Sequence, residues 1–194
     1  LTVEEQNELR ATIRVEGWYV KDGTDGATLN YTLPTDKLCK FITRIEAYAG
    51  KRDVRILHTW VLTFDSFTVR LKDVGLRLPL AGVERAEFGV EGGESIRREV
   101  PAKGVYLIQH LPDAFAVEEG EGKELAKGRR SAGWVLASSR TALLGVGHRD
   151  TWQRFPKELE VLPDALTLHL WPAHGRTHPE IDEYAHEQIN RLWF

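Results

Sequence analysis

The sequence contains no methionine, only one cysteine and no long hydrophobic run. A lone cysteine excludes an internal disulfide and a thiolate zinc site, so Cys39 is expected to be a buried, inert thiol. No apolar stretch approaches the roughly 18 residues that a membrane-spanning helix needs. A Gly-rich phosphate loop, a Gly-x-Ser-x-Gly elbow and a His-Glu-x-x-His helix are also missing, which excludes the enzyme classes built on them. Because position 1 is leucine, we expect a piece of a longer protein.

The chain also lacks a large excess of charge of either sign. The net charge is −3, and acidic and basic residues are interspersed along the chain. Nucleic acids and anionic membranes call for a basic patch, so we expect neither as a partner. A chain of 194 residues that is 42% hydrophobic can bury a sizeable core, and we interpret residues 1–194 as one domain.

Alternation of apolar and polar residues with a period of two dominates the chain. In residues 10–20, Ala11, Ile13 and Val15 share one face while Arg14 lies on the other. Similar patterns predict about ten strands and an all-β, antiparallel β-sandwich. Residues 119–131 are interpreted as an exposed loop and 150–158 as containing one helical turn. Pro179 begins a predicted C-terminal helix over 178–194. The strands are predicted over 10–20, 38–49, 54–64, 68–80, 84–90, 95–100, 104–110, 114–118, 132–138, 141–148 and 165–171.

Some aromatic residues and histidines invite a functional interpretation. Trp18 shares a face with Arg14 and Glu16, so it is predicted to contact another domain or to stack on a sugar ring. The apolar end Leu192-Trp193-Phe194 is likewise predicted to contact another domain. The spacing of His169, His174 and His178 fits no ligand set, so we predict hydrogen-bonded histidines and no metal site.

The segment from residue 148 to residue 160 is the richest in chemistry. It places His148, Arg149, Asp150, Trp152 and Lys157 next to a predicted strand end, where binding residues often lie. The same composition also suits a salt-bridged structural corner, and the residues alone leave both interpretations open.

Several sequence blocks, in order along the chain, together resemble the exo-rhamnogalacturonan lyase/YetA-like polysaccharide lyase family (PcRGLX/YetA-like). The resemblance spans about residues 10–194. The blocks are 44–50 (Arg-Ile-Glu-Ala-Tyr-Ala-Gly), 54–59 (Val-Arg-Ile-Leu-His-Thr), 74–80 (Val-Gly-Leu-Arg-Leu-Pro-Leu), 149–159 (Arg-Asp-Thr-Trp-Gln-Arg-Phe-Pro-Lys-Glu-Leu) and 168–172 (Leu-His-Leu-Trp-Pro).

The resemblance implies a three-part parent protein with an N-terminal β domain, a central β-sandwich and a C-terminal α/α toroid. This chain corresponds to the central sandwich, and residues 178–194 would lead into a toroid absent from the chain. The family is expected to cleave acidic, uronate-containing polysaccharide by β-elimination. Catalytic residues of toroid lyases generally lie on the toroid or in its cleft, so none is assigned here. For substrate binding the resemblance favours His148, Arg149, Asp150, Trp152 and Lys157.

Two other functions stay open at this point: a non-catalytic carbohydrate-binding module, and a scaffold that holds the flanking domains. The even charge mix and the lack of a dense aromatic stripe favour the scaffold over the module. The sequence supports no cofactor, although a divalent cation in the parent is not decided by it. It also leaves the compartment open, and a secreted or periplasmic parent is compatible with the resemblance.

Overall fold

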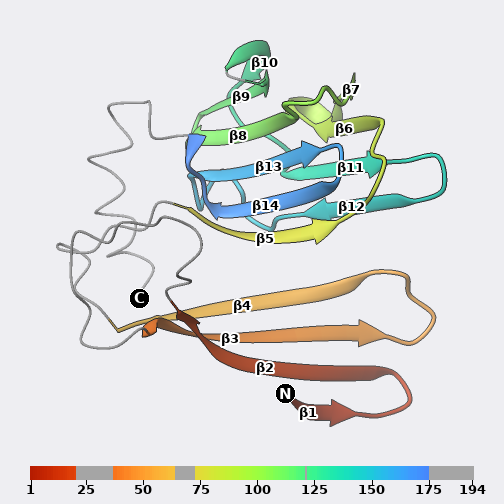
Figure 1. Cartoon of the computed structure of the whole chain (residues 1–194), viewed down its shortest axis with the longest axis vertical. Coiled ribbons are helices and arrows are strands. Elements are labelled where there is room, and N and C mark those ends of the chain that lie inside the picture. The colour runs from red at the N-terminus through yellow and green to blue at the C-terminus, as the bar shows by residue number, and fades with distance from the viewer. Residues whose placement is uncertain (21–36, 64–72, 121, 175–194) are drawn as a thin grey trace. The chain divides into compact units, whose positions relative to one another are not determined.

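The computed structural model describes residues 1–20, 37–63, 73–120 and 122–174. The chain divides into two compact units, Leu1–Arg70 and Leu71–Phe194. Fourteen strands lie in the described residues, and all their pairings are antiparallel (Figure 1). Among those residues no helix has the length and apolar character to cross a membrane. The predicted all-β antiparallel class is therefore confirmed.

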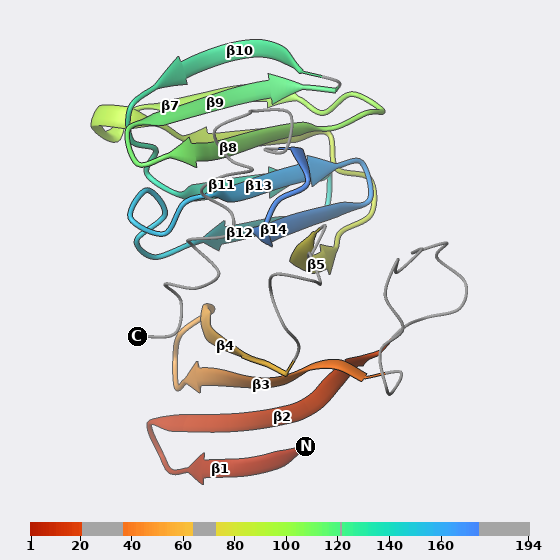
Figure 2. The ribbon, with the colours of Figure 1, turned by 90° about the vertical axis from the view of Figure 1, so that its left-hand side faces the viewer.

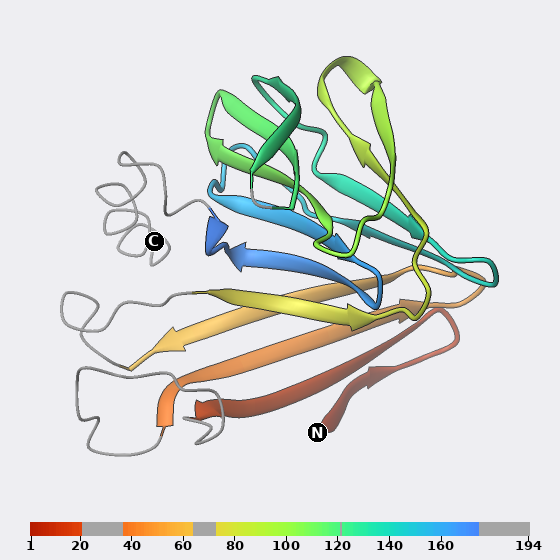
Figure 3. The ribbon, with the colours of Figure 1, turned by 45° about the horizontal axis from the view of Figure 1, so that its top comes forward.

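The first unit is a four-stranded sheet in the order β1-β2-β3-β4, red to orange in Figure 3. The pairing of Ile13 with Ile45, and of Ile45 with Ile56, places these three side chains in one row across the sheet. This register confirms the alternation predicted for residues 10–20. The strands are β1 (Thr2–Gln6), β2 (Arg10–Val20), β3 (Lys37–Tyr48) and β4 (Val54–Leu62).

On the opposite face of this sheet, ion pairs between charged residues join neighbouring strands. Glu4 accepts hydrogen bonds from Arg44 at 2.6 and 3.0 Å and from Arg14 at 3.1 Å. Arg14 also pairs with Glu16, which meets Lys40 at 2.9 Å. Each exposed pair contributes little alone, but the chain of pairs crosses three strands and so favours one register.

The second unit is a β-sandwich of two sheets. Figure 2 shows the strands of the larger sheet in the order β10-β9-β8-β13-β14-β5, and the smaller sheet has the order β12-β11-β6-β7. A single 3₁₀ turn, Glu91–Gly93, lies between β6 and β7. The strands are β5 (Val74–Pro79), β6 (Arg85–Gly89), β7 (Ser95–Glu99), β8 (Val105–Leu111), β9 (Ala114–Glu119), β10 (Lys123–Gly128), β11 (Trp134–Ser138), β12 (Leu143–Gly147), β13 (Lys157–Leu162) and β14 (Ala165–Trp171).

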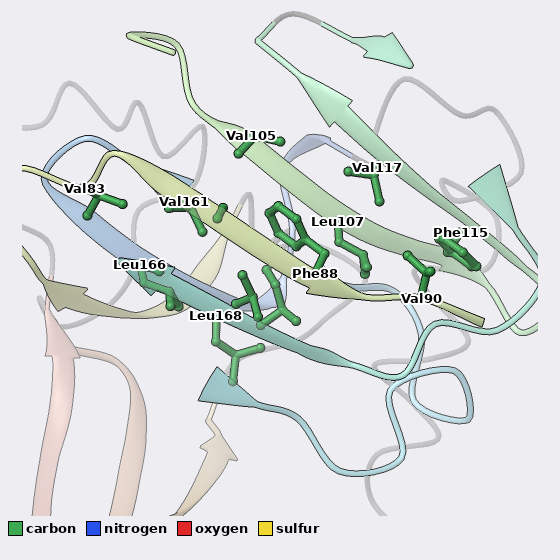
Figure 4. Packing of buried hydrophobic residues seen from close by; sticks show 14 residues of the cluster. Val83, Phe88, Val90, Val105, Leu107, Phe115, Val117, Val161, Leu166 and Leu168 are labelled. Atoms are coloured by element: carbon green, nitrogen blue, oxygen red, sulfur yellow. The ribbon is translucent and has the colours of Figure 1, made fainter. Parts of the chain in front are cut away.

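The core of the sandwich lies between its two sheets (Figure 4). Leu107 of β8 and Leu159 of β13 pair across the larger sheet and are 0% and 1% exposed. Phe88 of β6 enters the same cluster from the smaller sheet and is fully buried. Burying side chains of this size is the main favourable term in forming such a sandwich.

Gln109 of β8 is a buried polar residue that organises the loop before β11. Its side-chain oxygen accepts hydrogen bonds from the amide and the hydroxyl of Ser131, both at 2.9 Å. Its side-chain nitrogen lies 2.7 to 3.1 Å from the carbonyl oxygens of Leu111, Ala114 and Arg129. A fully satisfied buried amide of this kind fixes the loop to the sheet.

The structure corrects three details of the predicted strand pattern. Strand β1 was not expected, and β10 lies inside the segment interpreted as an exposed loop. Strand β13 was not expected either, and it begins at Lys157, directly after a turn closed by the bond from the Arg154 amide to the Asp150 carbonyl. These additions bring the count to fourteen rather than about ten. The predicted helix over 178–194 lies outside the described residues.

Truncating the centre of the core should be costly. Phe88→Ala is expected to lower the free energy of unfolding by about 3–5 kcal/mol, because the lost ring leaves a cavity. Leu143→Ala is the control, since Leu143 is 68% exposed, and its effect should stay within about 0.5 kcal/mol. Urea unfolding of both variants measures the difference. Equal losses would contradict the placement of Phe88 in the core.

Candidate functional site

The segment between β12 and β13 forms a structured loop. The His148 amide donates to the Gly133 carbonyl at 2.7 Å, and the Thr151 hydroxyl donates to the His148 carbonyl at 2.7 Å. A further bond, from the Arg154 amide to the Asp150 carbonyl at 3.0 Å, closes the turn. Asp150 has a φ of 59°, a conformation that few residues other than glycine and Asn or Asp adopt readily. The backbone of this loop is therefore well fixed.

Arginine side chains outnumber carboxylates on this loop. Arg149 lies 3.5 Å and Arg154 3.9 Å from the Asp150 carboxylate, and their side chains are 85% and 60% exposed. One carboxylate thus faces two guanidinium groups, both open to solvent. Guanidinium groups bind carboxylates well because their parallel donors match the two oxygens.

Trp152 extends this basic surface to a neighbouring segment. The guanidinium of Arg130 lies over the Trp152 ring, 4.1 Å from its centroid. Such a contact is attractive because the ring face carries negative charge. The indole therefore holds a third guanidinium in a fixed place beside the loop. We call Arg130, Arg149, Asp150, Trp152 and Arg154 the basic loop cluster.

Of the other two predicted site residues, His148 is half-buried and Lys157 is buried. Burial lowers the pKa of His148 to about 4, with further contributions from the charges of Lys157 and Arg154. Lys157 is 7% exposed, and its ammonium donates to the Pro156 carbonyl at 2.8 Å. Burial lowers the pKa of Lys157 to about 7. The substrate-binding role of the five residues stays a prediction, and only Arg149, Asp150 and Trp152 belong to the basic loop cluster.

The predicted interdomain contacts stay predictions. Trp18 lies on the polar face of the first unit, 38% exposed, with the Lys37 ammonium 5.2 Å from its ring centroid. That position agrees with the predicted face, while its partner stays a prediction. Leu192, Trp193 and Phe194 lie outside the described residues.

A second group of functional side chains lies on the larger sheet of the sandwich, on the face opposite the core. Tyr106, Glu158, Glu160 and His169 alternate with core residues along β8, β13 and β14. Tyr106 pairs with Glu160, and Glu158 pairs with His169, so the four lie together. We call this group, with Asp73, Glu118 and His174, the carboxylate–histidine face.

His169 connects two carboxylates of this face. Its Nδ1 lies 2.8 Å from Asp73 Oδ1 and its Nε2 lies 3.3 Å from Glu160 Oε2. Burial opposes the charged ring, but these hydrogen bonds and the nearby Glu158 raise the pKa of His169 to about 10. His169 is therefore an imidazolium at neutral pH and neutralises part of the acidic charge.

His174 and Tyr106 complete the group. The His174 ring stacks on the Tyr106 ring with centroids 4.2 Å apart and planes at 5°, and its Nδ1 lies 2.7 Å from Glu158 Oε1. The hydrogen bond to Glu158 raises the pKa of His174. The Tyr106 hydroxyl donates to Glu118 at 2.5 Å, and burial followed by this bond raises the pKa of Tyr106. Tyr106 therefore remains a protonated donor at neutral pH.

Sequence reasoning considered His169 and His174 but did not find their carboxylate partners. The signal was present in residues 157–162, where Glu158 and Glu160 alternate with Leu159 and Val161. Because no strand is predicted over 157–162, the sequence analysis does not place the two glutamates on one face of a strand.

The two packed sheets define the second unit as an antiparallel β-sandwich. Residues 1–86 match the family model of the PcRGLX-like protein central beta sandwich domain. This match confirms the resemblance expected from the sequence over residues 1–86, which include blocks 44–50, 54–59 and 74–80. Blocks 149–159 and 168–172 lie beyond the matched residues. No curated protein matches the chain.

The buried ammonium of Lys157 should make stability depend on pH. Its pKa in the folded chain is below the usual value of 10.5, so the unfolded chain binds more protons between about pH 7 and pH 10.5. The penalty of burying the charge is complete below pH 7 and is relieved as the pH rises. Lys157→Met should therefore raise the free energy of unfolding by about 1–3 kcal/mol at pH 6, with a smaller gain at pH 10.

Urea unfolding at pH 6, 8 and 10 measures this trend. Lys123→Met is the control, because the Lys123 side chain is 70% exposed and makes a surface ion pair with Glu119. The same pH trend in both variants would show that the Lys157 ammonium is not desolvated.

Proposed function

We propose that this chain is the central β-sandwich of a rhamnogalacturonan lyase-like protein that acts on uronate-containing polysaccharide by β-elimination. The family match over residues 1–86 is the observation that carries the proposal. In it, the sandwich supports the substrate cleft, and a flanking N-terminal β domain and a C-terminal α/α toroid supply the remaining parts. The basic loop cluster is the proposed point of contact with the polysaccharide.

The charges of the basic loop cluster fit the substrate. In β-elimination a base removes the proton at C5 of the uronate, and the 4-linked sugar leaves. Negative charge develops next to the carboxylate, so a cation or hydrogen-bond donor must neutralise it. Arg149 and Arg154 offer exposed guanidinium groups, and Trp152 keeps that of Arg130 in place. These groups are suited to hold the carboxylate of one uronate residue.

The described titratable groups are less suited to the role of base. The low pKa of His148, about 4, makes its imidazole a weak base at neutral pH. The raised pKa of Tyr106 makes its phenolate hard to form. The proposal therefore gives the chain a supporting and binding role, and assigns the proton abstraction to the flanking domains.

A carbohydrate-binding module is the second candidate. Trp18 favours it, because an exposed indole beside the Lys37 ammonium could stack on a sugar while the cation meets a carboxylate. A purely scaffolding domain would instead use Trp18 to contact a neighbouring domain. Sugar affinity of the isolated chain, lost in Trp18→Ala, would favour the module.

The lyase activity is tested on the full-length parent and on this 194-residue chain separately. Each is incubated with rhamnogalacturonan and with ulvan-type polymers while the absorbance band of unsaturated uronate is recorded. We expect the band to grow with the parent alone. An absorbance increase with the 194-residue chain by itself would overturn the supporting role. No increase with either protein would overturn the lyase assignment for these polymers.

Binding by the basic loop cluster is tested by titrating the chain with rhamnogalacturonan oligosaccharides at low ionic strength. Arg149→Ala should weaken binding about two- to fivefold, as expected for an exposed ion pair. Asp150→Asn should strengthen it, because the competing carboxylate charge is removed. Arg98→Ala is the matched control, since Arg98 is an exposed arginine on β7. Equal losses of affinity in Arg98→Ala and Arg149→Ala would show that binding depends only on overall charge and not on the basic loop cluster.

A further inference from the structure

The carboxylate–histidine face holds more carboxyl groups than histidines, and burial raises the pKa of one of these carboxyl groups, Glu158. Asp73, Glu118, Glu158 and Glu160 supply four carboxylates, and His169 and His174 supply two imidazoles. Glu158 is the most enclosed of them, with 1% of its surface exposed. An ionised carboxylate at such a position is costly unless a cation or several hydrogen bonds compensate it.

One oxygen of Glu158 lacks that compensation. Oε1 lies 2.7 Å from His174 Nδ1, but Oε2 is buried and makes no hydrogen bond in the described part of the chain. Most buried polar atoms in proteins are paired, so an orphaned carboxylate oxygen calls for an explanation. A bound cation is one such explanation, because it would accept a lone pair of Oε2 and also compensate the negative charge of the carboxylate.

Two further ligand atoms are near Glu158. Glu158, Glu160 and His174 each offer one ligand atom, and these three atoms lie within 4.8 Å of one another. Ligands that share a Zn²⁺ ion at about 2.1 Å are separated by roughly 3.4 Å in a tetrahedral site. The largest of these separations exceeds that spacing by at most about 1.4 Å, which small side-chain rotations can close. We propose that Glu158, Glu160 and His174 bind a divalent transition-metal ion.

The donor set selects the class of ion. Two carboxylates with one imidazole nitrogen suit Zn²⁺ or Mn²⁺, whereas Ca²⁺ takes oxygen ligands almost alone. Solvent has access to complete the coordination, because the His174 side chain is 41% exposed. When the ion binds, the ring nitrogen of His174 that ligates it carries no proton, and that proton passes to solvent.

The surrounding residues orient the three ligands. Tyr106 holds the His174 ring by stacking, and His169 lies 3.3 Å from Glu160 Oε2 and 3.8 Å from Glu158 Oε1. Asp73 in turn fixes His169 through its Nδ1. Partners of this kind typically hold metal ligands in place. The inference does not depend on the proposed lyase function, since the site uses none of the residues of the basic loop cluster.

Calorimetric titration of the untagged 194-residue chain with Zn²⁺ and with Mn²⁺, after removal of metal by chelator, tests the site. We expect one ion per chain and a higher midpoint of thermal unfolding in its presence. Glu160→Gln, which keeps the shape of the side chain and an acceptor oxygen, should weaken binding at least tenfold.

Glu118→Gln is the matched control, because Glu118 lies on the same face and accepts a hydrogen bond from Tyr106 but is not one of the three ligands. It removes the same charge and should change affinity less than threefold. Equal losses in the two variants would show general attraction of cations by an acidic surface and overturn the site. Failure of the unmodified chain to bind either ion, or tighter binding of Ca²⁺, would overturn it as well.

Discussion

The alternation of β13 is the constraint on which the second unit depends. Leu159 and Val161 point into the core, and the same strand must then direct Glu158 and Glu160 to the opposite face. Moving the register by one residue would place two glutamates among the apolar side chains of the core and direct Leu159 and Val161 to the polar face. The hydrophobic pattern therefore fixes the carboxylates in place without any need for the carboxylates to stabilise the fold. The two glutamates can therefore take on a function, because the stability of the fold comes from the core and not from them.

The two charged groups of the sandwich, the basic loop cluster and the carboxylate–histidine face, differ in their exposure to solvent. The basic loop cluster is exposed, and its guanidinium groups keep much of their hydration, so each ion pair there is weak and exchangeable. The carboxylate–histidine face is largely buried, so charges there interact strongly and shift the pKa values of His169 and His174 upward. A long, flexible polyanion suits the first environment, and a small ion suits the second.

The sequence predicted the fold class because alternation is a local property. The register of β2 against β3 follows directly from the row of apolar residues that includes Ile13 and Ile45. The carboxylate–histidine face was harder, because Asp73 and His169 are 96 residues apart and meet only through the pairing of β5 with β14. No spacing rule contains that pairing. The short strand β10, with two lysines and one glutamate, was missed because pairing with β9, and not composition, makes it a strand.

Charge also decides which part of the sandwich can meet a uronate polymer directly. Uronate carboxylates are repelled by the carboxylates of the carboxylate–histidine face, and His169 and His174 together neutralise only two of the four. A divalent ion at Glu158, Glu160 and His174 would reduce that repulsion. Its two ligand carboxylates would, however, balance most of its charge. The basic loop cluster faces no such opposition, because its single carboxylate, Asp150, is outnumbered by Arg149 and Arg154. We therefore propose the loop, and not the carboxylate–histidine face, as the contact with an acidic polysaccharide. The role proposed for the ion is to stabilise the buried carboxylates.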